Sequence, residues 1–545
     1  MRRRSAIISS LLVAATTAGA LTAASAHAVG GGSALDEKYR FVASIQTYER
    51  ECTGALIDVE WIITTSSCFA TNPDQGFPIP PGKPSIYTTV TVGSPDLGAS
   101  TAQKRTITTL VPREHRDLVL AKLDEPVLDV PPVSVGTTAP SPGDQVTALG
   151  FGRTATEWVP GRLHAGEFSV DTLDDTTVSL TPVASDAAIC KGDAGGPAVR
   201  EADGRLELVG IHSASWQGGC FGESETRSGV VETRLDDIAG WLERSPVKQR
   251  MASDPTLEDE IGTPVGPEVV DWPYRYQEFE RGEQRARLYW SDDTHETKFI
   301  RGAILDTYLR LGGHRELGAP YTDEISTADG AGSYNNLELN VCRSTATQAS
   351  TADSSLGCNS FSTISHSPST GAHHLEGSFY HRWEDLGREG GLGFPVGEQK
   401  ETTDSTGKWG AYVEFRKNSH GAILYVGSDT RLCAVYGGIY IRWKEYGREK
   451  GGLGVPEIDV TATPDGVGRY VHFTRNASIY WTPTTGAWEV HGAIRQKWAS
   501  MGWERSYLGY PISNEQAFEA GRRSWFQGGR IDYIARTGEV IAYRN

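Results

Sequence analysis

The stretch Cys190-Lys191-Gly192-Asp193-Ala194-Gly195-Gly196-Pro197 decides how the first half of this chain is interpreted. Its central residue, Ala194, follows an acidic residue and precedes two glycines. The methyl group of Ala194 cannot act as a nucleophile, because it carries no hydroxyl or thiol. The backbone amides of Gly192 and Ala194 do not depend on any side chain, so they can still form a pair of hydrogen-bond donors.

Several segments upstream of this loop have the pattern of β-strands. Residues 41–46 alternate in the manner of a half-buried strand, and residues 52–57 and 61–68 follow after short connections. The last of these segments ends at Ser66-Ser67-Cys68. Farther along the chain, Asp117 opens the run Asp117-Leu118-Val119-Leu120-Ala121-Lys122-Leu123.

In this order, the segments resemble the trypsin/chymotrypsin family of serine proteases. The family's loop reads Gly-Asp-Ser-Gly-Gly-Pro, and its counterpart of residues 61–68 ends in Ala-His-Cys. The resemblance implies that Ala194 stands at the position of the catalytic serine and Ser67 at that of the catalytic histidine, whereas Asp117 is retained. It covers about residues 28–243 and implies two six-stranded antiparallel barrels with a cleft between them.

The resemblance also assigns residues around the cleft. It implies an oxyanion hole at the amides of Gly192 and Ala194, and a specificity pocket at Ala188 and Ser213. Because Ala188 lies where trypsin-like members carry a carboxylate, we expect no preference for Lys or Arg. The disulfides that the resemblance implies are Cys52–Cys68 and Cys190–Cys220, the second of them across the pocket.

The start of the mature chain leaves two interpretations open. If cleavage falls after Ala28, the chain begins Val29-Gly30-Gly31, which resembles the start of activated trypsins. In that family the freed α-amino group pairs with the aspartate before the nucleophile, here Asp193. The alternative is a glycine-rich start without fixed structure.

The chemistry of peptide hydrolysis in this family needs a serine nucleophile, a histidine base and an aspartate that orients the histidine. Ser67 cannot act as the base, since a hydroxyl does not take up a proton reversibly near neutral pH. Nor do we expect Ser67 to be a relocated nucleophile, because Asp117 is a weak base. The other histidines of this region are expected on the surface or in structural hydrogen bonds: His115, His164 and His212.

Length and charge limit the remaining possibilities. A chain of 545 residues is too long for one hydrophobic core, so at least two domains are expected. The net charge of −17 argues against nucleic acid or an anionic membrane as the main partner. Residues 1–28 combine a basic start, an apolar run and small residues before the cleavage site, which is typical of a secretory signal peptide. We expect a secreted protein with no later membrane span, no metal and no cofactor.

The second half contains a repeated pattern. Copies of a Leu-Gly-x-Pro tetrapeptide, three clear and two weaker, begin at residues 261, 317, 392, 453 and 508, at spacings of 56, 75, 61 and 55. Each unit has a helix such as 439–447, then the tetrapeptide, then strands such as 468–473 and 477–481. The domains expected are a signal peptide at 1–28, a trypsin-like domain at 29–245, a polar linker at 246–256 and five repeats at 257–545.

This pattern resembles the LGFP repeat of exported actinobacterial proteins, over about residues 261–545. The resemblance implies anchoring at the cell wall, with wall polysaccharide or peptidoglycan as the partner. One unit cannot bury its own apolar face, so the units must stack or close. Because the last copy has no following helix, a mainly β, propeller-like ring of five units is expected, and an open stack is the alternative.

The long spacing indicates an insertion, which we place from Val341 to His374. Cys342 and Cys358 within it are expected to pair, which leaves Cys433 as the odd thiol among seven cysteines. Tryptophans at regular repeat positions are expected in the core: Trp383, Trp443 and Trp498. Less regular tryptophans are candidates for stacking on sugar rings: Trp409, Trp488 and Trp503.

Three functions remain open from the sequence. The favoured one is a secreted, non-catalytic protease homologue, held at the cell wall by its repeats, whose cleft binds an extended peptide. The second is an active serine-type endopeptidase of the trypsin family, which would need unseen replacements for two catalytic residues. The third is a wall-glycan-binding protein in which the first domain is only a scaffold.

Overall fold

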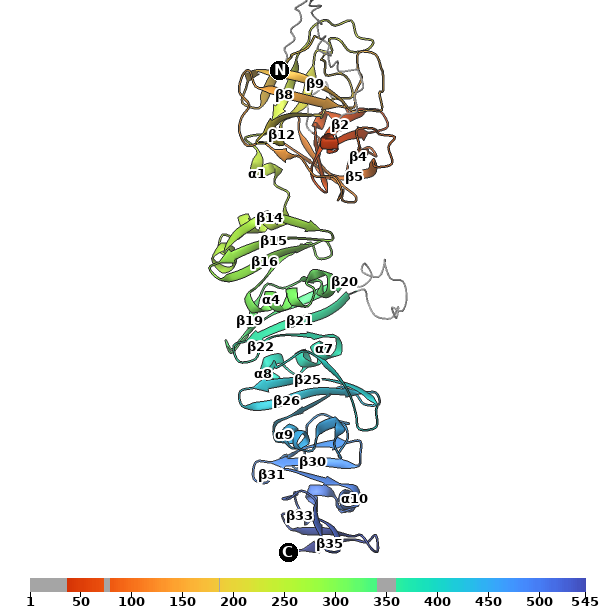
Figure 1. Cartoon of the computed structure of the whole chain (residues 1–545), viewed down its shortest axis with the longest axis vertical. Helices are drawn as coiled ribbons and strands as arrows, with labels where there is room; N and C mark the ends of the chain where they lie inside the picture. The colour runs from red at the N-terminus through yellow and green to blue at the C-terminus, as the bar shows by residue number, and fades with distance from the viewer. Residues whose placement is uncertain (1–36, 73–78, 186, 341–358) are drawn as a thin grey trace, which may run out of the picture. The chain divides into compact units, whose positions relative to one another are not determined.

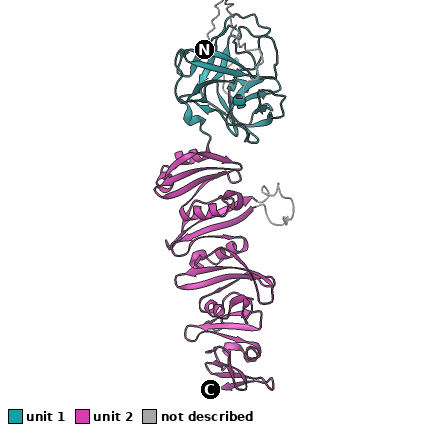
Figure 2. Ribbon diagram, viewed as in Figure 1, with its two compact units in different colours: residues 1–244 teal, residues 245–545 magenta. Residues whose placement is uncertain are grey.

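The computed structural model describes residues 37–72, 79–185, 187–340 and 359–545. It divides into two compact units, with the boundary between Arg244 and Ser245 (Figure 2). The expected signal peptide at residues 1–28 lies outside the described residues, as does the expected Cys342–Cys358 disulfide.

The first half of unit 1 is a closed antiparallel barrel of six strands in the order β1-β2-β3-β6-β5-β4. Its interior is filled by β-branched and leucine side chains such as Ile45, Ile63 and Leu120, none of which has exposed surface. Closure leaves no long strand edge free to pair with another chain. The strands are β1 (Val42–Gln46), β2 (Glu51–Asp58), β3 (Trp61–Thr64), β4 (Thr89–Val92), β5 (Gln103–Pro112) and β6 (Val119–Leu123).

A second barrel follows, with strands in the order β11-β8-β9-β10-β13-β12, and the pairing of β11 with β12 closes it. A short strand, β7, adds to β12 in parallel. The expected pair of six-stranded antiparallel barrels is therefore confirmed. The strands are β7 (Ser134–Val135), β8 (Gln145–Gly150), β9 (His164–Leu173), β10 (Thr177–Pro182), β11 (Pro197–Ala202), β12 (Arg205–Ser215) and β13 (Val230–Arg234).

The loop that contains Ala194 is fixed between the two barrels. The N–H of Thr53 in β2 donates to the Ala194 carbonyl (2.9 Å), and the N–H of Gly195 donates to the His212 carbonyl of β12 (2.8 Å). Gly195 has a φ of +86°, and a Cβ atom there would lie 1.9 Å from Oγ1 of Thr64. Only glycine fits this position, so the glycine after Ala194 is a requirement of the barrel contact.

The segment expected to be a linker, residues 246–256, is instead part of unit 2. Its proline stands in the first turn of a helix, where proline is tolerated, and Ser245 caps that helix by accepting a backbone N–H. The sequence of this helix is polar because Val247 is its one buried residue. Val247 packs in a core cluster with residues of the first sheet of unit 2. The helices near the boundary are α1 (Ala239–Leu242), α2 (Pro246–Ser253) and α3 (Leu257–Ile261).

Unit 2 contains five antiparallel sheets, one for each copy of the tetrapeptide. The first sheet consists of β14 (Thr263–Asp271), β15 (Tyr274–Arg281), β16 (Gln284–Ser291) and β17 (Thr297–Arg301). The second consists of β18 (Ala319–Pro320), β19 (Ile325–Ser326), β20 (Ser333–Asn340), β21 (Asn359–Ser367) and β22 (Gly371–Glu376). The third is β23 (Phe394–Pro395), β24 (Lys400–Thr403), β25 (Trp409–Lys417), β26 (His420–Gly427) and β27 (Cys433–Tyr436). The last two are β28 (Thr461–Ala462), β29 (Arg469–Phe473), β30 (Ala477–Thr482) and β31 (Gly486–His491), and β32 (Gln516–Phe518), β33 (Gly521–Phe526), β34 (Gly529–Ile534) and β35 (Val540–Arg544).

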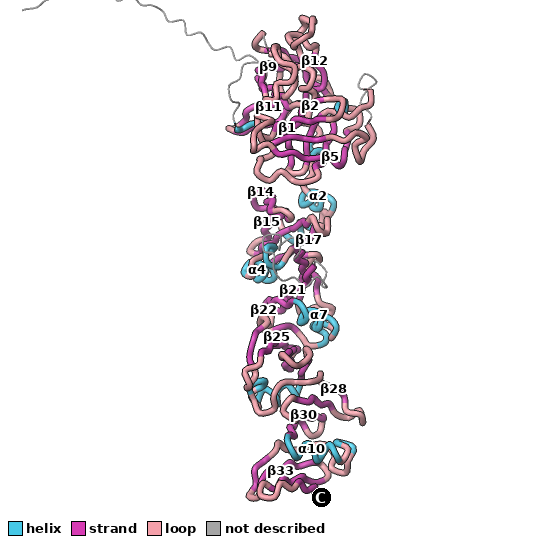
Figure 3. Tube along the Cα trace, turned by 90° about the vertical axis from the view of Figure 1, so that its right-hand side faces the viewer, coloured by secondary structure: helices cyan, strands magenta, loops and turns pink. Residues whose placement is uncertain are grey.

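A helix lies between each sheet and the next (Figures 1 and 3). Helix α4, for example, contacts β16 and β17 of its own sheet and β21 and β22 of the following sheet. Within unit 2 the sheets follow one another in series, so the unit is the open stack and not the expected closed ring (Figure 1). The helices are α4 (Gly302–Arg310), α7 (Gly377–Asp385), α9 (Gly437–Glu445) and α10 (Gly492–Ser500), followed by the short turns α5 (His314–Leu317), α8 (Arg388–Gly391), η5 (Arg448–Lys450) and η6 (Trp503–Arg505).

The insertion in the second repeat is shorter than the expected Val341–His374. Strand β21 pairs with β20 from Asn359 opposite Asn340, and β22 completes the same sheet, so residues 359–376 belong to the repeat itself. The extra length therefore falls between residues 340 and 359. Cys433 is buried and forms no disulfide, as expected, and burial raises the pKa of its thiol to about 11.

The tryptophans at equivalent repeat positions are core residues, as expected, because Trp383, Trp443 and Trp498 have no exposed surface. Trp383 and Trp443 also donate their indole N–H to the glycine carbonyl of the following tetrapeptide, Gly393 and Gly454. Each helix is thus fixed to the turn that starts the next sheet.

We expect Trp443→Ala to lower the free energy of unfolding of unit 2 by about 3–5 kcal/mol, because it removes a large buried side chain and its hydrogen bond. Trp409, which is 45% exposed, supplies the matched control. Trp409→Ala should change stability by no more than about 0.5 kcal/mol. Chemical denaturation followed by circular dichroism measures both, and equal effects would contradict the assignment of Trp443 to the core.

Candidate functional site

Ser67 and Ala194 line one groove of unit 1, with a volume of about 770 Å³. Ser67 lies in η2 (Ser66–Cys68), the turn that follows β3, and the Cys52–Cys68 disulfide fixes that turn to β2. The second expected disulfide, Cys190–Cys220, is also present. The structure therefore brings together segments that are more than 100 residues apart in the sequence.

Asp117 lies directly beside Ser67. The carboxylate accepts the Ser67 backbone N–H at 2.8 Å, the Ser67 hydroxyl at 3.1 Å and the Ser213 hydroxyl at 2.9 Å. Burial raises the pKa of Asp117, although these hydrogen bonds partly offset the effect. The arrangement places a buried carboxylate between two hydroxyls.

The amides of Gly192 and Ala194 remain available in the groove. Both residues line it, and neither amide donates a hydrogen bond within the described part of the chain. The loop nevertheless has a fixed backbone, because the Gly192 carbonyl accepts the Thr53 hydroxyl at 2.9 Å. Two unused donors on a fixed loop form a site for a carbonyl oxygen or an anion.

The carboxylate of Asp193 anchors this loop to the interior of the domain, and the residue has no exposed surface. Its carboxylate accepts the N–H of Gly152 at 2.7 Å and that of Cys190 at 2.9 Å, and it lies 3.1 Å from Nε2 of His164. The chain terminus expected to pair with Asp193, at Val29, lies outside the described residues. In the described structure His164 is the titratable neighbour of Asp193: burial alone would lower the pKa of His164, but the interaction with Asp193 outweighs burial and raises it.

A second buried ion pair lies under the same loop. Nδ1 of His212 is 2.6 Å from Oε1 of Glu232, and its Nε2 is 3.1 Å from the Leu149 carbonyl. The two ring nitrogens thus face a carboxylate oxygen and a carbonyl oxygen, an arrangement that favours the protonated ring. Burial lowers the pKa of His212, but Glu232 more than compensates and the net pKa is raised. His212 is thus a structural histidine, as expected.

Side-chain hydrogen bonds join the two segments in which the specificity pocket was expected, near Ala188 and Ser213. The Ser215 hydroxyl donates to the Ile189 carbonyl at 2.5 Å, and the Gln217 amide donates to the same carbonyl at 3.4 Å. On the other side, Oε1 of Gln217 accepts the Lys191 N–H at 2.9 Å. These hydrogen bonds join residues 189–191 to residues 215–217, which would form opposite walls of the pocket.

The rim of the groove combines an aromatic ring with charged groups. Trp158, which is 56% exposed, has the Arg153 guanidinium stacked 3.6 Å from its ring centroid. Arg153 and Lys191 both pair with Glu223, at 3.3 and 2.9 Å. The accessible groove therefore lies beside Trp158 and the Cys52–Cys68 disulfide.

Comparison with known proteins agrees with these features. Residues 28–242 match the Trypsin family, and residues 261–316, 317–391, 392–451 and 453–506 match the LGFP repeat. The first unit is a trypsin-family domain, and LGFP repeats follow it. The family match covers four repeats, whereas the structure contains a fifth sheet after residue 508.

Individual relatives are distant. The domain is 24% identical over 236 residues to snake venom serine proteinase 14 of Crotalus adamanteus. The matched region covers 39% of this chain and 85% of that protein. It is 22% identical over 234 residues to snake venom serine protease Haly-2 of Gloydius brevicauda, with 39% and 85% covered. The solved structure of neuropsin, a serine protease expressed in the limbic system of mouse brain, is 20% identical, covers 40% of this chain and 96% of its own, and has a TM-score of 0.31.

Several residues of the trypsin-family site were not identified from the sequence. His164 and Glu232 act only through contacts made by folding, and nothing in their local sequence marks them. Ser215 and Gln217 follow the expected pocket residue Ser213, so proximity in the chain was the one available signal. Among the described residues, no group of three or more His, Cys, Asp or Glu side chains is placed to hold a metal, and no helix could span a membrane.

The His212–Glu232 pair makes the stability of the trypsin-family domain depend on pH. Since the folded-state pKa of His212 is raised above its ordinary value of 6.5, the pair stabilises the domain fully below that value. This stabilisation should be lost as pH rises through the raised folded pKa. Thermal unfolding between about pH 5 and pH 9 should show this loss, and His212→Gln should reduce its slope.

His115 supplies the control, because it is exposed and forms no comparable pair. His115→Gln should leave the slope of stability against pH unchanged. A slope that is the same in wild type and in His212→Gln would mean that the pair carries no proton-linked stability.

Proposed function

We propose that this protein is a secreted, non-catalytic homologue of trypsin-family proteases that binds a partner through its groove and is held at the cell wall by its LGFP repeats. The observation that carries the proposal is the contact of Ser67 with Asp117 at 3.1 Å, beside an alanine at position 194. On this interpretation Ser67 replaces the catalytic histidine and Ala194 the catalytic serine.

The loss of chemistry follows from the two side chains. Ala194 has no hydroxyl to attack a carbonyl, and Ser67 cannot accept and return a proton near neutral pH. Disabling the nucleophile and base of such a triad costs about 10⁶-fold in turnover. No described histidine takes over the role of the base, since His164 and His212 are committed to buried pairs. These points weigh against the alternative of an active serine-type endopeptidase.

Binding does not need the lost groups. The free amides of Gly192 and Ala194, together with the rim at Trp158, give the groove donors and an aromatic surface for an extended peptide. The bridges of Ser215 and Gln217 across the specificity pocket favour the other alternative, in which the domain is a scaffold and only the repeats bind. Wall polysaccharide or peptidoglycan is proposed as the ligand of the repeats. The repeats match the LGFP family, and the sequence resemblance links that family to exported envelope proteins.

Restoring two side chains tests the proposed loss. Ser67→His together with Ala194→Ser should hydrolyse p-nitrophenyl acetate about 10²-fold faster than either single variant, because nucleophile and base act as a unit. A small acyl group is chosen because Ser215 and Gln217 bridge the pocket. The native chain should neither hydrolyse this ester above background nor take up a fluorophosphonate label.

Adding Asp117→Asn to the double variant is the control, and it should remove most of the gained activity. A double variant that is folded, with both disulfides intact, yet inactive would show that the amides of Gly192 and Ala194 do not form an oxyanion hole. The scaffold interpretation would then replace the peptide-binding one. Labelling of the native protein that is lost in Ser67→Ala would instead establish Ser67 as a nucleophile.

The tether can be tested with the two compact units expressed separately. Residues 245–545 should sediment with purified cell-wall material, and residues 29–244 should remain in solution. This result is expected because the repeats carry the wall affinity. Sedimentation of residues 245–545 with the wall should also persist in about 0.5 M salt if aromatic and hydrogen-bond contacts dominate. Co-sedimentation of residues 29–244 alone would contradict this division of roles.

A further inference from the structure

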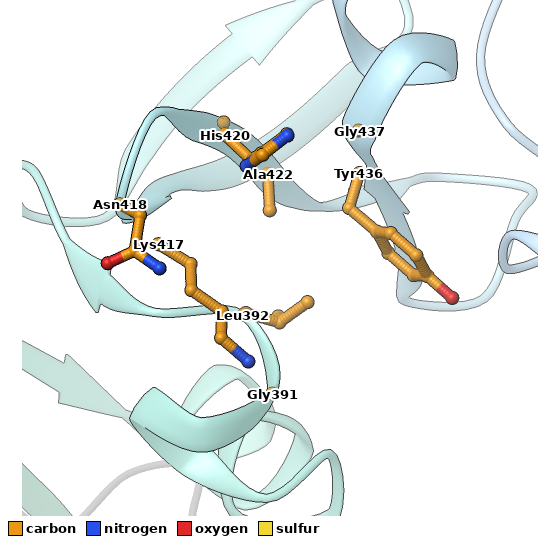
Figure 4. A pocket seen from close by; sticks show the side chains of 9 residues that line it. Gly391, Leu392, Lys417, Asn418, His420, Ala422, Tyr436 and Gly437 are labelled. Carbon is orange, nitrogen blue, oxygen red and sulfur yellow. The ribbon is translucent and has the colours of Figure 1, made fainter. Parts of the chain in front are cut away.

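The third repeat contains a hollow of about 250 Å³ between its hairpin and the start of α9. Leu392 and Ala422 form an apolar floor, and both are almost completely buried. Figure 4 shows Leu392 between Lys417 and Tyr436, with Ala422 beside His420 on the other side of the gap. The volume is below the roughly 300–1,000 Å³ of pockets for drug-sized ligands, so it suits one ring-sized group.

The strand registers identify the same positions in the fourth repeat. Ala422 lies opposite Phe415 on one side and Tyr436 on the other, and Ala477 lies opposite Phe473 and His491. The residue before the alanine is Gly421 in the third repeat and Asn476 in the fourth.

In the fourth repeat, side chains occupy this place. The amide of Asn476 donates to the Gly492 carbonyl at 3.1 Å, and Arg495 donates to Oδ1 of Asn476 at 2.7 Å. Gly421 in the third repeat has no side chain to make such a bridge. Nor could it gain one freely, because a Cβ atom at Gly421 would lie 2.6 Å from the ring of Tyr440, the counterpart of Arg495.

The first repeat closes the equivalent space differently. Arg301 holds the place of Tyr436, since it lies opposite Ala286, and it donates to the Glu260 carbonyl at 2.9 Å. Glu260 directly precedes the first tetrapeptide, as Gly391 precedes the third. The third repeat lacks both of these bridges and keeps its hollow, although Lys417 donates to the Gly390 carbonyl at the rim.

The lining has the chemistry of a sugar site. Tyr436, 37% exposed, offers a flat apolar ring with a hydroxyl at its edge, and Asn418 and His420 add hydrogen-bonding groups. Lys417 adds a positive charge while its Nζ donates to the Gly390 carbonyl, and none of the residues that line the hollow is a carboxylate. A ring with an apolar face, hydroxyl groups and one negative charge complements this lining.

We propose that the hollow of the third repeat binds a single sugar unit that carries a carboxylate or phosphate, and so provides a specific contact of the repeats with wall polysaccharide. This inference deepens the wall tether proposed above and rests on it for the source of the sugar. The site belongs to one repeat, and the remaining repeats act as its structural support.

Two sugars that differ by one acidic group test the proposal. N-acetylmuramic acid carries a lactyl carboxylate that N-acetylglucosamine lacks. In saturation-transfer NMR with the full secreted chain, N-acetylmuramic acid should give a signal at least about tenfold stronger at equal concentration, in keeping with a charge-assisted hydrogen bond. Equal signals from the two sugars would overturn the assignment of an acidic ligand.

Three variants locate the site. Gly421→Asn with Tyr440→Arg transplants the fourth-repeat pair into the third repeat, fills the hollow and should abolish the signal. Lys417→Gln changes an exposed side chain, leaves folding intact and should weaken binding about tenfold. Arg475→Gln removes a positive charge from the corresponding hairpin of the fourth repeat and should have no effect. Unchanged binding in both the filled variant and Lys417→Gln would overturn the proposal.

The wall assay separates this inference from the tether. If the filled variant still sediments with wall material as strongly as the native chain, the tether stands and the hollow is not its site. If the native chain binds N-acetylmuramic acid but not the wall, the hollow stands as a sugar site and the tether fails.

Discussion

The burial of the Asp193 carboxylate governs the geometry of the first unit. A buried anion costs several kcal/mol unless charge and hydrogen bonds compensate it. Asp193 meets this requirement through the amides of Gly152 and Cys190 and through His164. Each partner comes from a different segment, so the loop, the turn after β8 and the start of β9 are fixed together. The amides of Gly192 and Ala194 inherit their positions from this anchor, whichever side chain stands at position 194.

The resemblance to the trypsin family was sufficient for the double barrel and for the Cys52–Cys68 and Cys190–Cys220 disulfides. Features set by strand register were not predicted. His164 reaches Asp193 because it lies opposite Gly150 in the β8–β9 pair. Likewise, Ser215 and Gln217, which hydrogen-bond to residues 189–191, follow an irregular register in β12, and Gln217 has a left-handed backbone with a φ of 67°.

The repeats show the same division. Their helix, tetrapeptide and strands were predicted because each unit must bury one apolar face, which the sequence pattern states directly. The ring was wrong, because closure depends on the small rotation between units, and the tetrapeptide pattern carries no information about that angle. The prediction of a polar linker was wrong for another reason. Helix α2 buries only Val247, so it has no apolar stripe that the sequence could show. The signals for the helix were the capping residue Ser245 and the proline in the first turn.

Both candidate sites arise where a side chain is small and the frame around it is kept. On the proposed interpretation, Ala194 and Ser67 occupy a loop and a turn that backbone hydrogen bonds hold in place. In the third repeat, Gly421 stands where the fourth repeat has the bridging Asn476. The neighbouring core residues Phe415 and Ala422 remain buried. Such changes face a groove and not the interior, so they create little of the cavity cost that a core deletion would. At Gly421 the neighbouring ring of Tyr440 still limits which side chains fit, so a change there requires a change at position 440 as well.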